Sequence, residues 1–351
     1  MRAYMMVSRA KGRVLEIDGK KVSQGVFLTK GDSWLTPEVR SFILDHDPKG
    51  ILDPFAGEGH MLRAASTLLD VPRRGYDIDP AFGWPVNDSL ESIPGAQGWV
   101  IVTNPPYLAK HSAKRKGVRD RVERYYRFRN DLYQVALDKC IEAADAVVAI
   151  VPETIINSCY PKCHMHSVTV LENNPFSDTD CPVCVVCLEK HPHSLGQVSV
   201  YRRNKKLASL ADIDRARLHP KGDVRIIFNA KYGRVGLRAV DLTQPQDSIR
   251  FMIRADCDYP ADRIKVSSRL ITFVEIPNFP DKQIPQVVSK ANDILAAFRS
   301  ATADLALSPF KGNTTDGKRR RRLDYYSARA ILELAARSST GAESQLEFPL
   351  G

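Results

Sequence analysis

The residues of this chain most suited to chemistry are the seven from Ile101 to Tyr107. The apolar start of this segment predicts a short buried strand, and Asn-Pro-Pro-Tyr follows it. Pro105 and Pro106 fix φ and lack N–H donors, so the turn is stiff. Asn104 and the carbonyl of Pro105 can accept the two N–H bonds of a planar amine, while Tyr107 stacks on its ring. The simpler alternative is an ordinary strand-ending turn, because Asn-Pro pairs are common in turns.

A glycine-rich loop lies upstream of this turn. A short predicted strand ends at Asp53, and Pro54-Phe55-Ala56-Gly57-Glu58-Gly59 leads from it to a helix predicted over residues 61–69. Glycines let a backbone approach a ligand at the N-terminus of a helix. The spacing matches neither the G-x-G-x-x-G of dinucleotide folds nor the Gly-Lys-Ser/Thr ending of a P-loop. The loop therefore favours a nucleoside that lacks a pyrophosphate.

Two further acids follow the loop in order along the chain. Asp77 ends a second predicted strand, where a carboxylate can bind ribose hydroxyls. Asp88 lies in a third segment, residues 86–90, shortly before the catalytic turn. The sequence thus predicts a cofactor loop, a ribose-binding acid and an amine-binding turn, each after a successive predicted strand.

With Asp-Pro-Phe-Ala-Gly-Glu-Gly at residues 53–59 and Asn-Pro-Pro-Tyr at residues 104–107, the chain resembles the S-adenosylmethionine-dependent N6-adenine DNA methyltransferases. The order of a Thr-Pro segment, cofactor loop, catalytic turn and C-terminal remainder is that of their gamma group. The resemblance covers about residues 34–188. It implies a Rossmann-like class I methyltransferase sheet, an α/β fold, followed by a C-terminal α+β region for DNA recognition.

The resemblance also implies roles for single residues. Asp77 would bind the ribose of S-adenosylmethionine, Ile78 would pack on its adenine, and Asp88 would accept from its adenine amine. Ser89 departs from relatives, which often carry an aromatic residue there. Relatives also carry an aromatic residue that packs on the target base, and Phe176 is the candidate for it here. The methionine part of the cofactor would be bound by Thr36, Asp53, Phe55, Gly57 and Gly59. Pro54, in the same glycine loop, is also assigned to the cofactor.

The elements that must position these residues can be predicted in outline. Thr36 is a plausible N-cap for a helix that starts at Pro37, and a hairpin is expected over residues 7–27. Composition divides the chain into residues 1–33, an extension; 34–195, the catalytic domain; and 196–351, the target-recognition region. Neither a signal peptide nor a membrane-spanning run is evident, so a cytoplasmic protein is expected. A monomer is also expected, although the sequence leaves the oligomeric state open.

The charge of the chain favours a polyanionic partner. Lys and Arg number 51 against 41 acidic residues, a net charge of +10. Two basic segments are candidates for contacts with DNA, expected to be double-stranded: Lys114-Arg115-Lys116, and Lys318 with Arg319, Arg320, Arg321 and Arg322. The alternative for each is a solvated surface.

The seven cysteines do not predict a metal site. Cys181, Cys184 and Cys187 are expected along one apolar strand, where a spacing of three points neighbours to opposite faces. No metal is therefore expected, and free thiols fit a reducing compartment.

The expected reaction is methyl transfer from S-adenosylmethionine to the N6 amine of an adenine flipped out of the duplex. The alternatives are methylation of adenine N6 or guanine N2 in RNA, methylation of a protein glutamine, or a non-catalytic DNA-binding protein on a decayed methyltransferase fold. The recognition sequence and the existence of a cognate restriction endonuclease are left open by the sequence.

Overall fold

A computed structural model describes residues 29, 31–176, 179–257, 259–260, 262 and 270–340. The hairpin expected over residues 7–27 lies outside the described residues. The chain forms two compact units, Met1–Ser209 and Leu210–Gly351.

The first unit is built on an eight-stranded sheet in the order β2-β1-β3-β4-β6-β5-β7-β8. The first four strands in this order run parallel, and β6 is antiparallel to both of its neighbours, β4 and β5. The expected α/β, Rossmann-like sheet is therefore confirmed. Its strands are β1 (Ile51–Asp53), β2 (Arg73–Gly75), β3 (Val100–Thr103), β4 (Ala146–Pro152), β5 (Met165–Val170), β6 (Val183–Glu189), β7 (Ser199–Arg202) and β8 (Lys205–Ser209).

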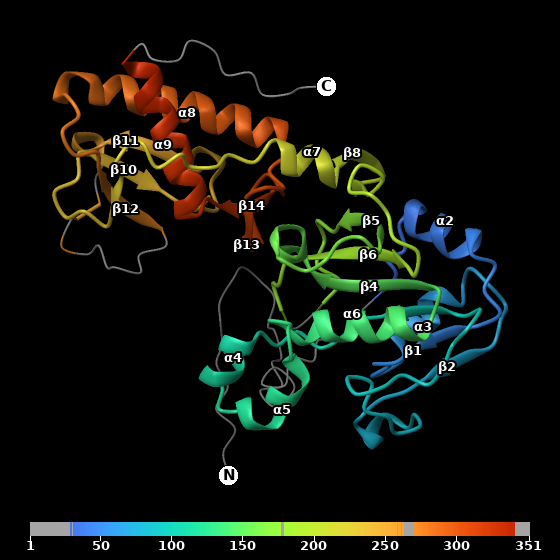
Figure 1. Cartoon of the computed structure of the whole chain (residues 1–351). Helices are drawn as coiled ribbons and strands as arrows, with labels where there is room; N and C mark the ends of the chain where they lie inside the picture. The colour runs from blue at the N-terminus through green and yellow to red at the C-terminus, as the bar shows by residue number, and fades with distance from the viewer. Residues whose placement is uncertain are drawn as a thin grey trace. The chain divides into compact units, whose positions relative to one another are not determined.

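Helices connect these strands. Proline at the first helical position and Thr36 at the N-cap start α2, as expected. Helix α6 packs along β4, and α4 and α5 follow the catalytic turn as a short pair (Figure 1). The helices of this unit are α2 (Pro37–Asp45), α3 (His60–Ala65), α4 (Lys110–Arg115), α5 (Arg119–Tyr126) and α6 (Leu132–Ala143).

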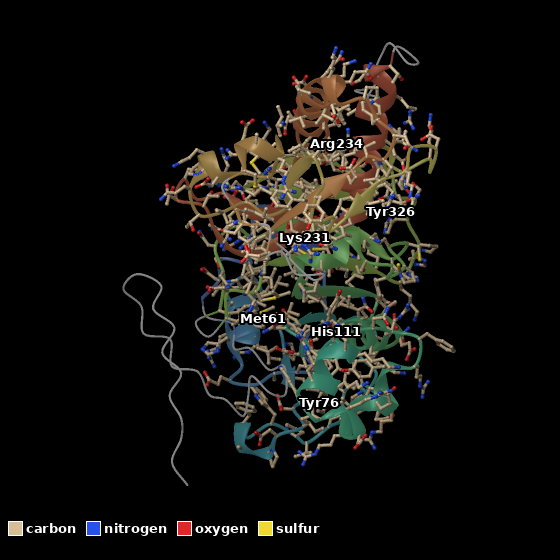
Figure 2. The ribbon with its side chains drawn as sticks, turned by 90° about the vertical axis from the view of Figure 1, so that its left-hand side faces the viewer. Met61, Tyr76, His111, Lys231, Arg234 and Tyr326 are labelled. Carbon is tan, nitrogen blue, oxygen red and sulfur yellow. The ribbon has the colours of Figure 1, made fainter. Side chains whose placement is uncertain are left out.

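The core of this unit explains why its central strands are continuous apolar runs. Every residue of β3 and β4 is buried. A strand covered on both faces must be apolar throughout rather than alternating. Met61 on α3 adds to this core, whereas Tyr76, in the turn after β2, is partly exposed; Figure 2 labels both.

The second unit is an α+β structure, as expected for the C-terminal region. Its four-stranded antiparallel sheet has the order β11-β10-β12-β9, and α8 packs on β11 and on α9 (Figure 1). Strands β13 and β14 form a separate antiparallel pair. The elements are α7 (Leu210–Arg215), β9 (Ile227–Phe228), β10 (Val235–Arg238), β11 (Arg250–Ile253), β12 (Ile271–Glu275), α8 (Ile284–Ala301), β13 (Ser308–Asn313), β14 (Arg319–Arg322) and α9 (Tyr325–Ser339).

The boundary between the units lies later than the composition predicts. The sequence places it between residues 195 and 196, but β7 and β8 extend the sheet of the first unit to Ser209. Because β7 pairs with β5 over residues 199–202, this segment belongs to the first unit despite its charge. Among the described residues, no helix has both the length and the apolar character needed to cross a bilayer.

Candidate active site

The predicted site residues follow strands that end at one edge of the sheet. Strands β1 and β3 are parallel neighbours, and they end at Asp53 and Thr103. The carboxyl edge of such a sheet is where ligands bind in open α/β folds. The glycine loop and the catalytic turn therefore start side by side.

Asp53 is the most unusual group at this edge, because its carboxyl is only 1% exposed. Its Oδ1 accepts a hydrogen bond from the Thr103 hydroxyl at 2.7 Å and from the Phe55 amide at 3.0 Å. Its buried Oδ2 has no hydrogen-bond partner among the described residues. Burial raises the pKa of Asp53 from 3.8 to about 7, with a smaller contribution from the charge of Asp77; the bonds from Thr103 and Phe55 oppose the shift. A buried carboxyl that loses its proton near neutral pH is suited to bind a cationic hydrogen-bond donor.

The hydroxyl of Thr36 is a second buried group without a partner among the described residues. Its side chain does not cap α2, although Thr36 is the N-cap residue. Thr36 and Asp53 were both assigned to the cofactor by the resemblance. Unpaired buried polar atoms are uncommon and indicate a missing ligand or water.

The glycine loop has the backbone that its sequence predicts. Gly57 and Gly59 have φ values of 49° and 76°, in the left-handed region that glycine adopts without strain. A Cβ at Gly59 would lie 2.9 Å from Cζ2 of Trp84, whose Nε1 donates to the Gly57 carbonyl at 2.8 Å. The loop is thus closely packed on Trp84, a residue that sequence reasoning missed because it belongs to no recognised motif.

Asp77 is hydrogen-bonded to the glycine loop. Its Oδ2 accepts from the Gly57 amide at 2.8 Å, and its Oδ1 accepts from the Asp79 amide at 2.9 Å. Each carboxylate oxygen can accept a second bond, so capacity for ribose hydroxyls remains. Ile78 is 61% exposed beside it and offers an apolar surface.

Asp88 is engaged by helix α5. Its Oδ2 accepts from the Tyr125 hydroxyl at 2.6 Å and from Arg124 Nη2 at 3.3 Å. The neighbouring Ser89 is buried. The acid that the resemblance assigns to the cofactor adenine therefore shares one oxygen with Arg124 and Tyr125 of α5.

The turn at residues 104–107 is held by its own tyrosine. The Tyr107 hydroxyl lies 2.5 Å from Asn104 Oδ1 and 2.7 Å from the Ile150 carbonyl, at the far end of β4. Tyr107 is 8% exposed, and burial raises its pKa well above the ordinary value. The hydroxyl therefore stays protonated and remains a donor at neutral pH.

Phe176 lies beside this turn, so the structure brings the two predicted aromatic residues together. Its ring meets Tyr107 edge-on, with centroids 6.1 Å apart and an interplanar angle of 67°. Tyr133 of α6 contacts Tyr107 from another direction at 6.2 Å. Phe176 is held by an isolated bridge to Thr29. Pro105 is buried and Pro106 is partly buried in the same turn.

The backbone after the turn is anchored by residues that were not predicted. The Leu108 amide donates to Asp131 Oδ1 at 2.9 Å, and the Tyr126 hydroxyl donates to the Leu108 carbonyl at 2.8 Å. Burial raises the pKa of Asp131 to about 7. An Asp at the start of a helix was the only available signal, and that position usually indicates a cap rather than a long-range contact.

The two basic segments differ in exposure. Lys114, Arg115 and Lys116 are all exposed at the end of α4. The second segment forms β14, and the expectation that its whole run is at the surface is wrong for Arg321, which is 1% exposed.

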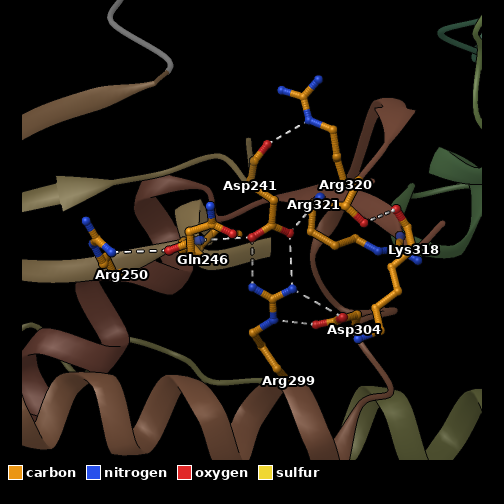
Figure 3. A network of polar contacts seen from close by, with 10 residues as sticks. Asp241, Gln246, Arg250, Arg299, Asp304, Lys318, Arg320 and Arg321 are labelled. Atoms are coloured by element: carbon orange, nitrogen blue, oxygen red, sulfur yellow. Dashed lines mark hydrogen bonds and ion pairs between the residues drawn. The ribbon is translucent and has the colours of Figure 1, made fainter. Parts of the chain in front are cut away.

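The backbone of Arg321 is bonded to an ionic network centred on Asp241 in the second unit (Figure 3). Asp241 Oδ2 accepts from the Arg321 amide at 3.0 Å, and its two oxygens accept from Arg299 at 3.0 and 3.1 Å. Arg320 donates to the Asp241 carbonyl at 2.7 Å and lies over the Phe310 ring. Asp241 thus binds the Arg321 backbone and the Arg299 side chain, and Arg320 is held by contacts within the same unit.

Comparisons with known proteins add two solved structures. The chain is similar to the methyltransferase subunit of a type I restriction-modification system from Streptococcus thermophilus, with 16% identity, a TM-score of 0.33, and coverage of 54% of this chain and 53% of that chain. It is also similar to TrmN from Thermus thermophilus, with 22% identity, a TM-score of 0.28, and coverage of 44% of this chain and 49% of that chain. The chain thus spans about half the length of each. No family model and no curated protein matches it.

Proposed function

We propose that this chain transfers a methyl group from S-adenosylmethionine to the N6 amine of an adenine flipped out of double-stranded DNA. The observation that carries the proposal is the buried carboxyl of Asp53, whose Oδ2 is unpaired among the described residues. Its Oδ1 is bonded to Thr103, the residue directly before Asn104. One hydrogen bond thus connects the cofactor loop to the catalytic turn.

The residues present fit the cofactor. S-adenosylmethionine supplies an electrophilic methyl group when bound. Asp53 Oδ2 and the Thr36 hydroxyl would receive the polar methionine part, which carries an ammonium and a carboxylate. Asp77 would bind the ribose hydroxyls, and the exposed Ile78 would pack on the cofactor's adenine. Asp88 would accept from the adenine amine in place of one of its present donors, Arg124 or Tyr125.

Asn104 would act on the acceptor amine. Its Oδ1 and the Pro105 carbonyl accept the two N6 hydrogens, which favours a tetrahedral nitrogen with a free lone pair. To do so, Asn104 Oδ1 gives up the Tyr107 hydroxyl, which keeps the Ile150 carbonyl as its acceptor. One hydrogen bond replaces another, so the exchange costs little. Positioning then supplies most of the rate enhancement, with no covalent enzyme intermediate.

DNA is the proposed macromolecular partner. A base inside a duplex cannot reach a turn held this closely, so the nucleotide has to be flipped out. Tyr107 and Phe176 would form aromatic walls for the flipped base, and stacking on such walls contributes about 1–3 kcal/mol per base. The exposed Lys114-Arg115-Lys116 segment, in the same unit, would contact phosphates.

The proposal is tested by radiolabelled methyl transfer to DNA, RNA and protein, followed by nucleoside analysis of the product. We expect N6-methyladenine in DNA. The variant Asn104→Ala should lose methylation and keep cofactor affinity, because Asn104 contacts the acceptor rather than the cofactor. Label in RNA or protein would identify that molecule as the substrate in place of DNA. Label in none of the three would favour the non-catalytic alternative. Turnover above a few per cent in Asn104→Ala would contradict the catalytic role of Asn104.

A further inference from the structure

The end of the sheet opposite the catalytic turn carries a cluster of histidines around one glutamate. Glu189 is the last residue of β6 and pairs with Ala146, the first residue of β4. Tyr107 instead contacts Ile150, near the other end of β4. The cluster therefore lies away from the candidate active site.

Three histidines direct ring nitrogens at this carboxylate. His193 Nε2 lies 2.5 Å from Glu189 Oε2, His46 Nε2 lies 3.2 Å from Oε1, and His166 Nδ1 lies 3.5 Å from Oε1. They come from three separate segments: the end of α2, strand β5 and the connection after β6. The potential ligand atoms of His166, Glu189 and His193 all lie within 4.8 Å of one another.

We propose that His166, Glu189 and His193 bind a divalent zinc ion, with His46 as a fourth ligand. Imidazole nitrogens and a carboxylate oxygen are ordinary zinc ligands, and structural zinc sites have four of them. A tetrahedral zinc ion with bonds of ~2.0–2.1 Å holds its ligand atoms roughly 3.4 Å apart. The ligand atoms of His166, Glu189 and His193 lie at most 4.8 Å apart, so the widest pair would close by up to ~1.4 Å. His193 Nε2 and Glu189 Oε2, now 2.5 Å apart, would separate by a little under an ångström.

The orientation of His46 supports this assignment. Its Nδ1 lies 2.8 Å from the Phe42 carbonyl, an acceptor only, so Nδ1 carries the proton. Its Nε2 is then the atom turned toward Glu189. A second ring nitrogen that donates to a backbone carbonyl is the usual way in which a metal-binding histidine is oriented. The Phe42 ring also packs on His46 and His166, with centroids 4.5 and 5.1 Å away.

The sequence predicts no metal site, and the spacing of Cys181, Cys184 and Cys187 is the reason; the proposed site departs from that prediction and uses no cysteine. Cys184 and Cys187 are buried on β6, and Cys181 precedes that strand. The proposed site instead joins α2, β5 and residues 190–193 to the end of β6. Its role is to hold the connection after β6 on the sheet.

The experiment uses the full-length protein, stripped with a chelator and dialysed against Zn²⁺, and measures bound metal and thermal unfolding. We expect one zinc ion per chain and, at a Zn²⁺ concentration about 100 times Kd, an increase in Tm of roughly 5 °C. His166→Ala should weaken binding at least tenfold, and the exposed position of this side chain leaves the core of the unit intact. His191→Ala is the matched control, because His191 is exposed and lies outside the cluster.

Cobalt substitution provides a second readout. Co²⁺ should give the visible bands of a tetrahedral site and no thiolate charge-transfer band, because no cysteine is a ligand. Glu189→Gln should remove those bands while His191→Ala keeps them. Unchanged Tm on adding Zn²⁺, equal binding by His166→Ala and wild type, or a thiolate band would each overturn the proposal. The first of these would mean that the cluster is only a set of ion pairs.

Discussion

At the scale of single residues, the protonation of Asp53 links the fold to cofactor binding. The carboxyl is buried beside Thr103 and has a pKa of about 7. In the unfolded chain the same group ionises near 3.8. Between these values the folded chain holds a proton that the unfolded chain has lost, so stability decreases as the pH rises through this range and levels off above about 7.

We therefore predict that affinity for S-adenosylmethionine increases between pH 5 and pH 7. The ionised carboxylate is the form that binds an ammonium, so affinity should rise up to about tenfold per pH unit below the pKa. Calorimetry at several pH values measures this slope. Asp53→Asn keeps the acceptor for Thr103 but cannot ionise, so it should bind weakly and without this dependence. Equal slopes in both proteins would exclude Asp53 as the titrating group.

The same substitution tests the stability of the ligand-free protein. Asp53→Asn should be more stable than wild type at pH 8 by an amount on the order of a few kcal/mol, because it removes an ionised, desolvated carboxyl. At pH 4 the two proteins should differ little, since Asp53 is protonated in the folded wild type. Urea unfolding at both pH values is the measurement, and a wild type that is more stable at pH 8 contradicts the explanation.

Asp77 supports a separate prediction. Asp77→Ala should weaken S-adenosylmethionine binding by about 1–3 kcal/mol, because it removes the acceptors for ribose and for the Gly57 amide. Asp79→Ala is a matched control, since its Oδ1 accepts from the Ala81 amide within the same turn. Unchanged affinity in Asp77→Ala, measured by calorimetry, would place the ribose elsewhere.

At the scale of elements, Asp241 holds three parts of the second unit together. Its carboxylate accepts from Arg299 on α8, from the Arg321 amide on β14 and from the Ile249 amide at 2.9 Å, directly before β11. It is 4% exposed. A buried acid with this many donors cannot be removed without leaving them uncompensated.

We predict that Asp241→Ala lowers the free energy of unfolding of the second unit by about 3–5 kcal/mol. The control is Asp316→Ala, which breaks the exposed pair with Lys318 and should change the free energy of unfolding little. Denaturant titration of both variants measures the difference. Similar small losses in the two variants would show that the Asp241 network contributes little.

At the scale of the whole molecule, the net charge of +10 is the property that concerns DNA. The exposed basic residues differ between the two segments. Lys114, Arg115 and Lys116 are exposed, whereas Arg321 is buried and Arg320 is bonded to the Asp241 carbonyl. The first segment is therefore the stronger candidate for phosphate contacts, and Lys318 with Arg319 and Arg322 remains the second.

We predict that replacing Lys114, Arg115 and Lys116 by Gln flattens the salt dependence of DNA binding by about 2–3 units of logarithmic slope, at ~0.9 per phosphate contact. Replacing Lys318, Arg319 and Arg322 by Gln tests the second segment in the same assay. Cofactor affinity should stay unchanged when Lys114, Arg115 and Lys116 are replaced. That measurement is the control that the variant is folded. Parallel slopes for wild type and both variants would mean that neither segment contacts phosphates.

The sequence by itself determined the fold class and the order in which the segments of the candidate site follow one another along the chain. The fold class rests on the resemblance carried by residues 53–59 and 104–107. Short-range signals indicate the local elements: the apolar runs of β3 and β4, the glycines at 57 and 59, and Pro37 after Thr36. Each depends on backbone preferences or on burial of both faces of a strand, which neighbouring residues report. The fold class and the helix start at Pro37 are confirmed, and the roles of Asn104, Asp77 and the basic segments stay predictions.

Only the tertiary structure decided which side chains meet across distant segments. The Asp53–Thr103 bond joins residues on two strands, and Trp84 packs under a loop that it does not adjoin in sequence. The boundary at Ser209 depends on the pairing of β7 with β5. The backbone of Arg321 is bonded to Asp241, which also pairs with Arg299. The histidines gather on Glu189 because α2 and β5 flank β6. Long-range pairing of this kind leaves no periodic signal in the sequence, since it depends on packing rather than on local propensity.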